Sequence, residues 1–252
     1  MEAVPTPFKL IRDQNFHNSW FQAVDFARTY GVDREIGGHE YLDGVETGKV
    51  KKSPIRDTRQ FFLLGRNALD QIETFELHPD FRLQRPREYA REFTYEFNKE
   101  YLATPKDKRF AYIYFNLLVD PVDQLVGLRD NLARQIALDL PSNRCQAITW
   151  QPSKHIKDHE PPCLQRIQIR YLGEGEVEVS LEWRSRDVLD AWQINLVGIV
   201  YMLNRYVLGP NMCRIAILTE NNFSLHIYLK ELSYALTVTP ISINPQLTAR
   251  LY

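Results

Sequence analysis

The segment Trp192–Leu208 (WQINLVGIVYMLNRYVL) constrains the fold more than any other, because it is apolar nearly all round. A helix without a polar face must be enclosed by other elements or by a membrane. This segment falls short of the roughly 20 apolar residues of a membrane span, and Asn195 and Arg205 interrupt it. Gly209-Pro210 follows directly, as expected of a helix that ends with a C-terminal glycine. The sequence therefore predicts one buried helix at the centre of a globular fold.

The chain on either side of this helix predicts strands. In Gln165–Tyr171 and Glu176–Leu181, apolar and polar residues alternate, as they do in strands with one buried face. Gly173-Glu174-Gly175 lies between them and supplies the glycines that a tight hairpin requires. Apolar and β-branched residues predict three further strands, at Cys145–Trp150, Cys213–Thr219 and Phe223–Leu229.

Two segments predict amphipathic helices. Asp123–Leu138 spaces its leucines and Ile136 to form one apolar stripe, and Asn18–Tyr30 also has helical spacing. The rest of the first hundred residues, including the Gly- and charge-rich stretch Gly37–Lys52, shows no clear pattern. No repeat, low-complexity tract or linker divides the chain, so we expect one domain over residues 1–252.

Charge and cysteine content exclude several classes of function. Lys and Arg (31) nearly balance Asp and Glu (32), so no overall field attracts nucleic acid or an acidic membrane, and any anion site must be local. Cys145, Cys163 and Cys213 match neither a disulfide framework nor a zinc-ligand pattern. The N-terminus lacks the apolar core of a signal peptide. We therefore expect a cytoplasmic protein without a metal.

Four segments occur in an order that points to a known family: SNRCQAITWQ (Ser142–Gln151), PPCLQ (Pro161–Gln165), RSRDVLDAWQIN (Arg184–Asn195) and HIY (His226–Tyr228). In these segments and their spacing, the chain resembles the thymidylate synthase and deoxycytidylate hydroxymethylase family. Leu164 after the cysteine and Trp183 before the arginine make the shorter archaeal-type thymidylate synthases the most similar branch. The similarity is most specific over residues 142–228. It implies a mixed α+β domain with a large twisted sheet flanked by helices, and a homodimer in which two such sheets pack face to face.

Cys163, within PPCLQ, is the candidate nucleophile. C5 of a pyrimidine is a poor nucleophile until a thiolate adds to C6, so chemistry at C5 depends on a cysteine. A free thiol has a pKa of about 8.5, and a nearby cation favours its thiolate form. The family pattern assigns that cation to Arg184. An isolated cysteine is more often a small apolar filler, but its place in this motif favours catalysis.

The resemblance also assigns residues to the nucleotide. Arg184 and Ser185 would contact the 5′-phosphate, and Arg144 would cross the dimer interface to the phosphate in the partner subunit. His226 and Tyr228 would bind the ribose 3′-hydroxyl. Outside such a motif, residues of these types are more often solvated ion pairs or core side chains bonded to the backbone.

Asn195 would determine which pyrimidine base the site accepts. In the family, asparagine here pairs with N3–H and O4 of uracil, whereas aspartate accompanies cytosine, and the donor and acceptor of an amide match uracil. The alternative is a buried amide bonded to nearby backbone. The resemblance also places Asp187 and Ala191 against the pterin ring of a folate, and counts Tyr114 and Asp187 with Cys163 among the catalytic residues.

The chain departs from the family pattern at several positions. Asn143 stands where a second arginine is usual, and Ala191 where many members have glycine. Phe115 and Leu118 follow Tyr114, where glycine and often arginine are usual. The C-terminal QLTARLY differs from the usual closing tail. Two family residues have only candidates here: Glu73, Glu76 and Glu88 for the glutamate of proton transfer, and Arg56 and Arg59 for an N-terminal phosphate-binding arginine.

The resemblance implies reductive methylation of dUMP to dTMP, with 5,10-methylenetetrahydrofolate as donor of both carbon and hydride. A modified pterin could replace the folate. The departures after Tyr114 and at the C-terminus leave a second enzyme open, a 5-hydroxymethylase acting on dUMP, dCMP or CMP, in which water captures the exocyclic methylene. A third reading is a non-catalytic homologue that binds a nucleotide or a partner protein.

Overall fold

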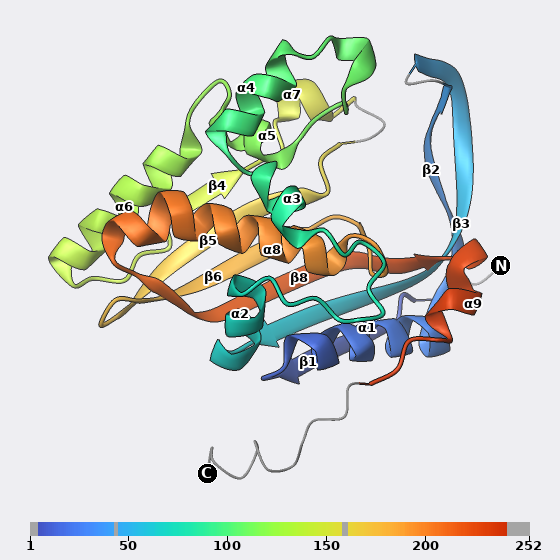
Figure 1. Cartoon of the computed structure of the whole chain (residues 1–252), viewed down its shortest axis with the longest axis horizontal. Coiled ribbons are helices and arrows are strands. Elements are labelled where there is room, and N and C mark those ends of the chain that lie inside the picture. Colours follow the sequence, from blue (N-terminus) through green and yellow to red (C-terminus); the bar gives the residue numbers. More distant parts are fainter. Residues whose placement is uncertain (1–4, 43–44, 158–160, 241–252) are drawn as a thin grey trace.

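The computed structural model describes residues 5–42, 45–157 and 161–240, built around one eight-stranded sheet (Figure 1). Neighbouring strands follow the order β1 (Phe8–Asp13), β3 (Val45–Leu64), β8 (Arg214–Tyr228), β6 (Glu176–Trp183), β5 (Leu164–Gly173) and β4 (Gln146–Ile148). β2 (Val32–Leu42) pairs with β3, and β7 (Arg186–Asp187) pairs with β8. Three pairs, β1–β3, β6–β8 and β7–β8, are parallel, and the other pairs are antiparallel. This mixed sheet with flanking helices confirms the predicted fold class.

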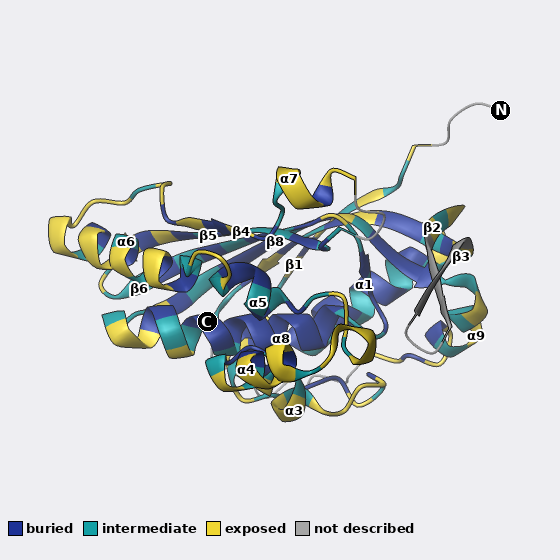
Figure 2. Cartoon of the chain, turned by 90° about the horizontal axis from the view of Figure 1, so that it is seen from above, coloured by how far each residue is buried: buried dark blue, intermediate teal, exposed yellow. Residues whose placement is uncertain are grey.

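The helices are distributed unequally over the two faces of the sheet. Figure 2 shows α1, α3, α4 and α8 stacked on one side and the short α7 on the other. The α-helices are α1 (Phe16–Tyr30), α2 (Arg66–Glu73), α3 (Pro86–Arg91), α4 (Tyr95–Ala103), α5 (Tyr114–Val119), α6 (Gln124–Leu138), α7 (Pro152–His155), α8 (Trp192–Leu203) and α9 (Leu232–Ala235). Among the described residues, no helix is both long and apolar enough to cross a membrane.

The buried central helix is confirmed as α8, in which every residue except Tyr201 is buried. Its predicted end is wrong. The backbone continues through a π turn (Asn204–Leu208) into a 3₁₀ turn (Gly209–Asn211), where Gly209 has a φ of −55°. The left-handed conformation falls on Met212 instead, with a φ of 51°. Gly209 therefore acts inside a continuing turn and not as the cap.

The predicted hairpin is confirmed between β5 and β6. Ile167, Ile169 and Tyr171 of β5 are buried, and both hairpin glycines have positive φ, 104° at Gly173 and 74° at Gly175. This backbone favours glycine because side chains rarely adopt it.

The two strands predicted at Cys213–Thr219 and Phe223–Leu229 are a single strand, β8. The polar run between them has the composition of a loop, yet Glu220 and Asn222 are fully buried. They remain within the strand because buried Arg186 donates to both side chains. This buried ion pair therefore stabilises the extended strand in a segment whose composition favours a turn.

The first hundred residues, which lack a clear sequence pattern, form three strands and four helices of this sheet-and-helix assembly. The stretch Gly37–Lys52 belongs to the antiparallel β2–β3 hairpin, whose far end projects away from the helices in Figure 1. The side chains of residues 38–51 lie outside the described part of the chain.

Candidate functional site

Cys163 lies half-buried directly before β5, where strand pairing brings an arginine to its sulfur. The backbone N–H of Arg184, just after β6, donates to the carbonyl of Cys163 at 2.8 Å. The Arg184 side chain then folds back, so that Nη2 donates to Pro161 O at 2.9 Å and lies 3.6 Å from Cys163 Sγ. Burial raises the pKa of the Cys145 thiol to about 12 and also raises that of Cys213.

Ser185, His226 and Tyr228 gather next to this arginine. The register of β7 with β8 sets Asp187 opposite His226, and Ser185 Oγ lies 3.5 Å from His226 Nδ1. The ring of Tyr228 is 5.3 Å from that of His226. Burial, and then the nearby Arg184 cation, lower the pKa of His226 to about 4. The imidazole is therefore neutral at pH 7 and can exchange hydrogen bonds with a hydroxyl.

Asp187 is a carboxyl whose surroundings hold a proton near neutral pH. It accepts a hydrogen bond from Leu189 N at 2.8 Å, and its carbonyl accepts one from Ala191 N at 3.2 Å. Burial, assisted by the charges of Asp190 and Glu231, raises its pKa to about 7. These three carboxyl groups lie within 4.8 Å of one another, a spacing that could hold a cation. Arg82, however, already pairs with Asp190 and Glu231.

Asn195 lies in the second turn of α8, only 5% exposed, with its side chain directed to α3. Its Oδ1 accepts a hydrogen bond from the hydroxyl of Tyr89. The next turn of α8 has Gly198, where a Cβ would collide with Phe93 of the segment after α3. The glycine allows this close contact, which fixes the position of Tyr89 relative to Asn195.

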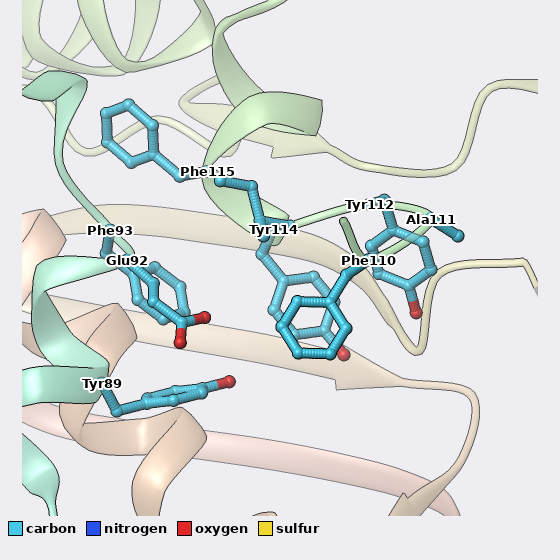
Figure 3. A pocket seen from close by; sticks show the side chains of 9 residues that line it. Tyr89, Glu92, Phe93, Phe110, Ala111, Tyr112, Tyr114 and Phe115 are labelled. Carbon is cyan, nitrogen blue, oxygen red and sulfur yellow. The ribbon is translucent and has the colours of Figure 1, made fainter. Parts of the chain in front are cut away.

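A cavity of about 320 Å³ lies between α3 and the segment leading into α5 (Figure 3). Figure 3 shows the carboxyl of Glu92 and the hydroxyls of Tyr89 and Tyr114 turned toward the same space. The cavity is lined by Tyr89, Glu92, Phe93, Phe110, Ala111, Tyr112, Ile113, Tyr114 and Phe115. Burial raises the pKa of Glu92, which has no hydrogen bond or ion pair among the described residues. A carboxyl with a raised pKa in a cavity is a candidate for proton transfer.

Two residues of the cavity lining, Tyr112 and Tyr89, connect it to Cys163 and Asn195, which do not line it themselves. The Tyr112 phenol is hydrogen-bonded to the backbone of Cys163 and to Tyr114, and burial raises its pKa. Burial also raises the pKa of Tyr114 well above its usual value, as the negative charge of the Cys163 thiolate does to a smaller extent. Tyr89 connects the other side to Asn195. The candidate nucleophile and the candidate base-binding amide are thus each hydrogen-bonded to a tyrosine that lines the cavity, which Glu92 also lines.

Arg186 and Glu220 form a fully buried ion pair beneath this space, with Nη2 and Oε1 2.7 Å apart. Glu220 also accepts from the indole N–H groups of Trp183 at 2.9 Å and Trp192 at 2.8 Å. The guanidinium lies 4.0 Å from the Trp183 ring, and its Nε and Nη1 have no partner among the described residues. Its positive charge acts on Tyr114 and Cys163.

The chain resembles several archaeal proteins along most of its length. Proteins named "Putative thymidylate synthase" from Methanothermobacter marburgensis and Methanothermobacter thermautotrophicus are 25% and 26% identical to it. The alignments cover 83% and 77% of this chain and 88% and 82% of those proteins. A protein of the same name from Methanosarcina acetivorans is 23% identical, over 87% of this chain and 89% of its own length. These similarities support a thymidylate synthase-like family for the chain. It matches no protein-family model.

In this thymidylate synthase-like enzyme, none of the three candidate glutamates lines the cavity. Glu73 pairs with Arg66 at 2.7 Å, and Glu76 accepts a hydrogen bond from Thr74. Glu88 is exposed on α3. Tyr89 and Glu92 were not identified from the sequence. Pro86, Tyr89 and Glu92 follow one another at intervals of three residues, a spacing that places side chains on one face of a helix.

Of the remaining candidate arginines, two contact other residues and the third has no side-chain partner among the described residues. Arg56 is engaged by Asp33 at 2.8 Å, and Arg59 lies 4.8 Å over the ring of Phe223. Arg144 is exposed, and its guanidinium has no partner among the described residues. The C-terminal QLTARLY lies outside the described part of the enzyme.

Proposed function

We propose that this enzyme methylates dUMP at C5 to give dTMP, using 5,10-methylenetetrahydrofolate and a Cys163 thiolate. The observation that carries the proposal is the 3.6 Å approach of Arg184 Nη2 to Cys163 Sγ, beside a cavity that also holds Glu92 and Tyr89. A cysteine beside an arginine, together with an amide and a carboxyl that the tyrosines of one cavity connect to it, suits addition to a pyrimidine ring.

Each residue has a defined part in the chemistry. The Cys163 thiolate forms a bond to C6, and the electron pair of the C5–C6 double bond moves toward C5 and O4. Asn195 stabilises the charge that develops on O4 by donating from Nδ2. Glu92 moves protons to and from the base through the cavity. C5 would then form a bond to the one-carbon unit that the reduced folate supplies and lose its proton, and the bond between that carbon and the folate nitrogen would break. Hydride from the folate would add to the exocyclic methylene, so that the C5–C6 double bond re-forms, the bond between sulfur and C6 breaks and the thiolate is restored.

The nucleotide's phosphate and sugar would bind along the ends of β6, β7 and β8. Arg184 and Ser185 offer charged and hydroxyl donors to the 5′-phosphate. His226 and Tyr228 face the ribose 3′-hydroxyl. The neutral imidazole of His226 suits a hydroxyl, and its Nε2 has no partner among the described residues.

The folate side rests on Asp187 and Ala191. The half-buried Asp187 carboxyl accepts a hydrogen bond from Leu189 N and retains lone pairs that fit the N–H donors of a pterin ring. Ala191 begins α8 beside it with a small side chain. When bound, the reduced folate, or a modified pterin in its place, supplies the one-carbon unit and the hydride. Asp187, with a pKa of about 7, can hold or release a proton at this position.

The sheet face opposite the helices suits a homodimer. Apolar side chains on five strands of this face are 36–59% exposed: Phe8, Leu10, Leu63, Ile148, Leu172 and Phe223. Apolar patches of this kind usually mark an interface. A second copy of the chain covering it would place the exposed Arg144 near the partner's site, where it would bind the phosphate.

A 5-hydroxymethylase is the second candidate, because the cavity offers polar groups that could position water. Glu92 and the phenols of Tyr89 and Tyr114 are within hydrogen-bonding reach of a shared solvent space (Figure 3). Water attack on an exocyclic methylene would need such a site.

Product masses test the proposal and separate the two candidates. The protein is incubated with dUMP, dCMP, UMP or CMP and methylenetetrahydrofolate, and each nucleotide product is identified by mass spectrometry. We expect dTMP from dUMP. A hydroxymethylated product selects the alternative enzyme, and no modified nucleotide from any substrate contradicts both.

A further inference from the structure

The oxygen of the Asn195 amide has a hydrogen-bond partner, whereas its nitrogen has none among the described residues. Oδ1 accepts the hydrogen bond of the Tyr89 hydroxyl, whereas Nδ2 has no partner among the described residues and is not one of the buried unpaired atoms. Asn195 therefore presents Nδ2 as the donor that is open to a ligand.

A hydroxyl can donate or accept, so this contact alone would tolerate a flipped amide. Burial, and then the charge of Glu92, raise the pKa of Tyr89 far above neutral, so the phenol keeps its proton. A phenol that keeps its proton can donate it, and the Tyr89 hydroxyl donates to Asn195 Oδ1.

The contact between the two helices is rigid. Tyr89 and Phe93 lie close on the α3 side, with ring centroids 5.6 Å apart. Phe93 occupies the place where a Cβ of Gly198 would be, one turn beyond Asn195 on α8. Tyr89 cannot move away from Asn195 without disturbing this close packing.

We propose that Tyr89 is a positioning residue that sets the base specificity of the enzyme by fixing the orientation of the Asn195 amide. The inference rests on the proposed function. With Tyr89 donating to Oδ1, Nδ2 meets O4 of uracil, and the second lone pair of Oδ1 accepts N3–H. Cytosine offers an acceptor at N3 and a donor at its amino group, so it needs the flipped amide. Flipping would set Nδ2–H against the phenol proton.

The test compares Tyr89→Phe with wild type in two measurements. The first is kcat/KM for dUMP and dCMP. The second is the equilibrium binding of both nucleotides to proteins with Cys163→Ala, where chemistry does not contribute. We expect wild type to prefer dUMP, and Tyr89→Phe to lower the dUMP:dCMP ratio by about tenfold in both measurements, because a freed amide serves either base.

Two controls separate orientation from general damage. Tyr95→Phe removes a partly buried hydroxyl that donates to Asp123 at 2.5 Å, not to Asn195, and should leave the ratio unchanged. In an Asn195→Asp background, Tyr89→Phe should no longer change the ratio, since both carboxylate oxygens are acceptors and there is no orientation to fix.

The outcomes distinguish this inference from the function beneath it. If wild type prefers dUMP and Tyr89→Phe retains the full preference, the positioning role is overturned while the proposed function stands. If wild type binds neither nucleotide, or prefers dCMP, the proposed uracil chemistry fails and the inference fails with it.

Discussion

The two walls of the site are formed by different kinds of secondary structure. The strand wall, Cys163, Arg184, Ser185 and His226, lies at strand ends that backbone pairing aligns. The helical wall, Tyr89, Glu92, Tyr112 and Tyr114, lies on α3 and the segment entering α5.

The two walls also differ in their charges and in the pKa values of their side chains. On the strand wall an exposed guanidinium lies next to the thiol, and it helps to keep His226 neutral. On the helical wall burial raises the pKa of the three phenols, which keep their protons at neutral pH, and it also raises the pKa of the Glu92 carboxyl. We propose from this difference that the strand wall provides the nucleophile and the anion contact, and that the helical wall moves protons and orients the base.

Glu92→Gln should have the largest effect on turnover and tests that division directly. The amide keeps the size of the side chain but cannot exchange a proton, so kcat should fall roughly a hundredfold or more, while the dissociation constant for dUMP changes little. Glu88→Gln, on the exposed side of the same helix, is the matched control. Near-normal kcat in Glu92→Gln would remove the helical wall from the chemistry.

Arg186→Met and Arg184→Met compare how two arginines of the segment Arg184–Asn195 contribute to stability and to binding. Removing the guanidinium leaves the Glu220 carboxylate buried without a counter-ion, and the free energy of unfolding should fall by about 3–5 kcal/mol. The double variant Arg186→Met, Glu220→Gln should recover much of it. Arg184→Met, at an exposed position, should scarcely change stability but should weaken dUMP binding. Urea denaturation and calorimetry measure both quantities, and equal stability losses for the two arginines would contradict this account.

The strand wall could be predicted from the sequence far better than the helical wall. Cys163, Arg184 and Asn195 lie in contiguous motifs, and the alternation of β5 and β6 predicts the hairpin that aligns them. The role of Glu92 depends instead on burial, because its carboxyl differs from that of Glu88 only in what covers it.

The continuity of β8 was missed for a related reason. Its centre contains Glu220, Asn221 and Asn222, a composition that favours a turn. Glu220 and Asn222 fit a sheet interior because Arg186 of β7 donates to both and the indoles of Trp183 and Trp192 donate to Glu220, and no local pattern reveals contacts between residues so distant in sequence.

Asp187→Asn should have the smallest effect, on the pH dependence of stability. Its folded pKa of about 7 lies above the ordinary value near 4, so its contribution to stability is complete at low pH and is lost as pH rises toward 7. The variant lacks this titration, so its free energy of unfolding should decline less than that of wild type between about pH 5 and pH 7. Urea denaturation at several pH values measures the two slopes, and identical slopes would show that Asp187 titrates normally.

Covalent capture with 5-fluoro-dUMP tests the central claim most directly. The fluorine cannot leave C5 as a proton does, so the bond between the thiolate and C6 should persist in the presence of methylenetetrahydrofolate. Mass spectrometry of the digested protein should find the nucleotide on the peptide that contains Cys163, and Cys163→Ala should bind dUMP yet form no adduct. An adduct on Cys145 or Cys213, or normal turnover by Cys163→Ala, would contradict the account.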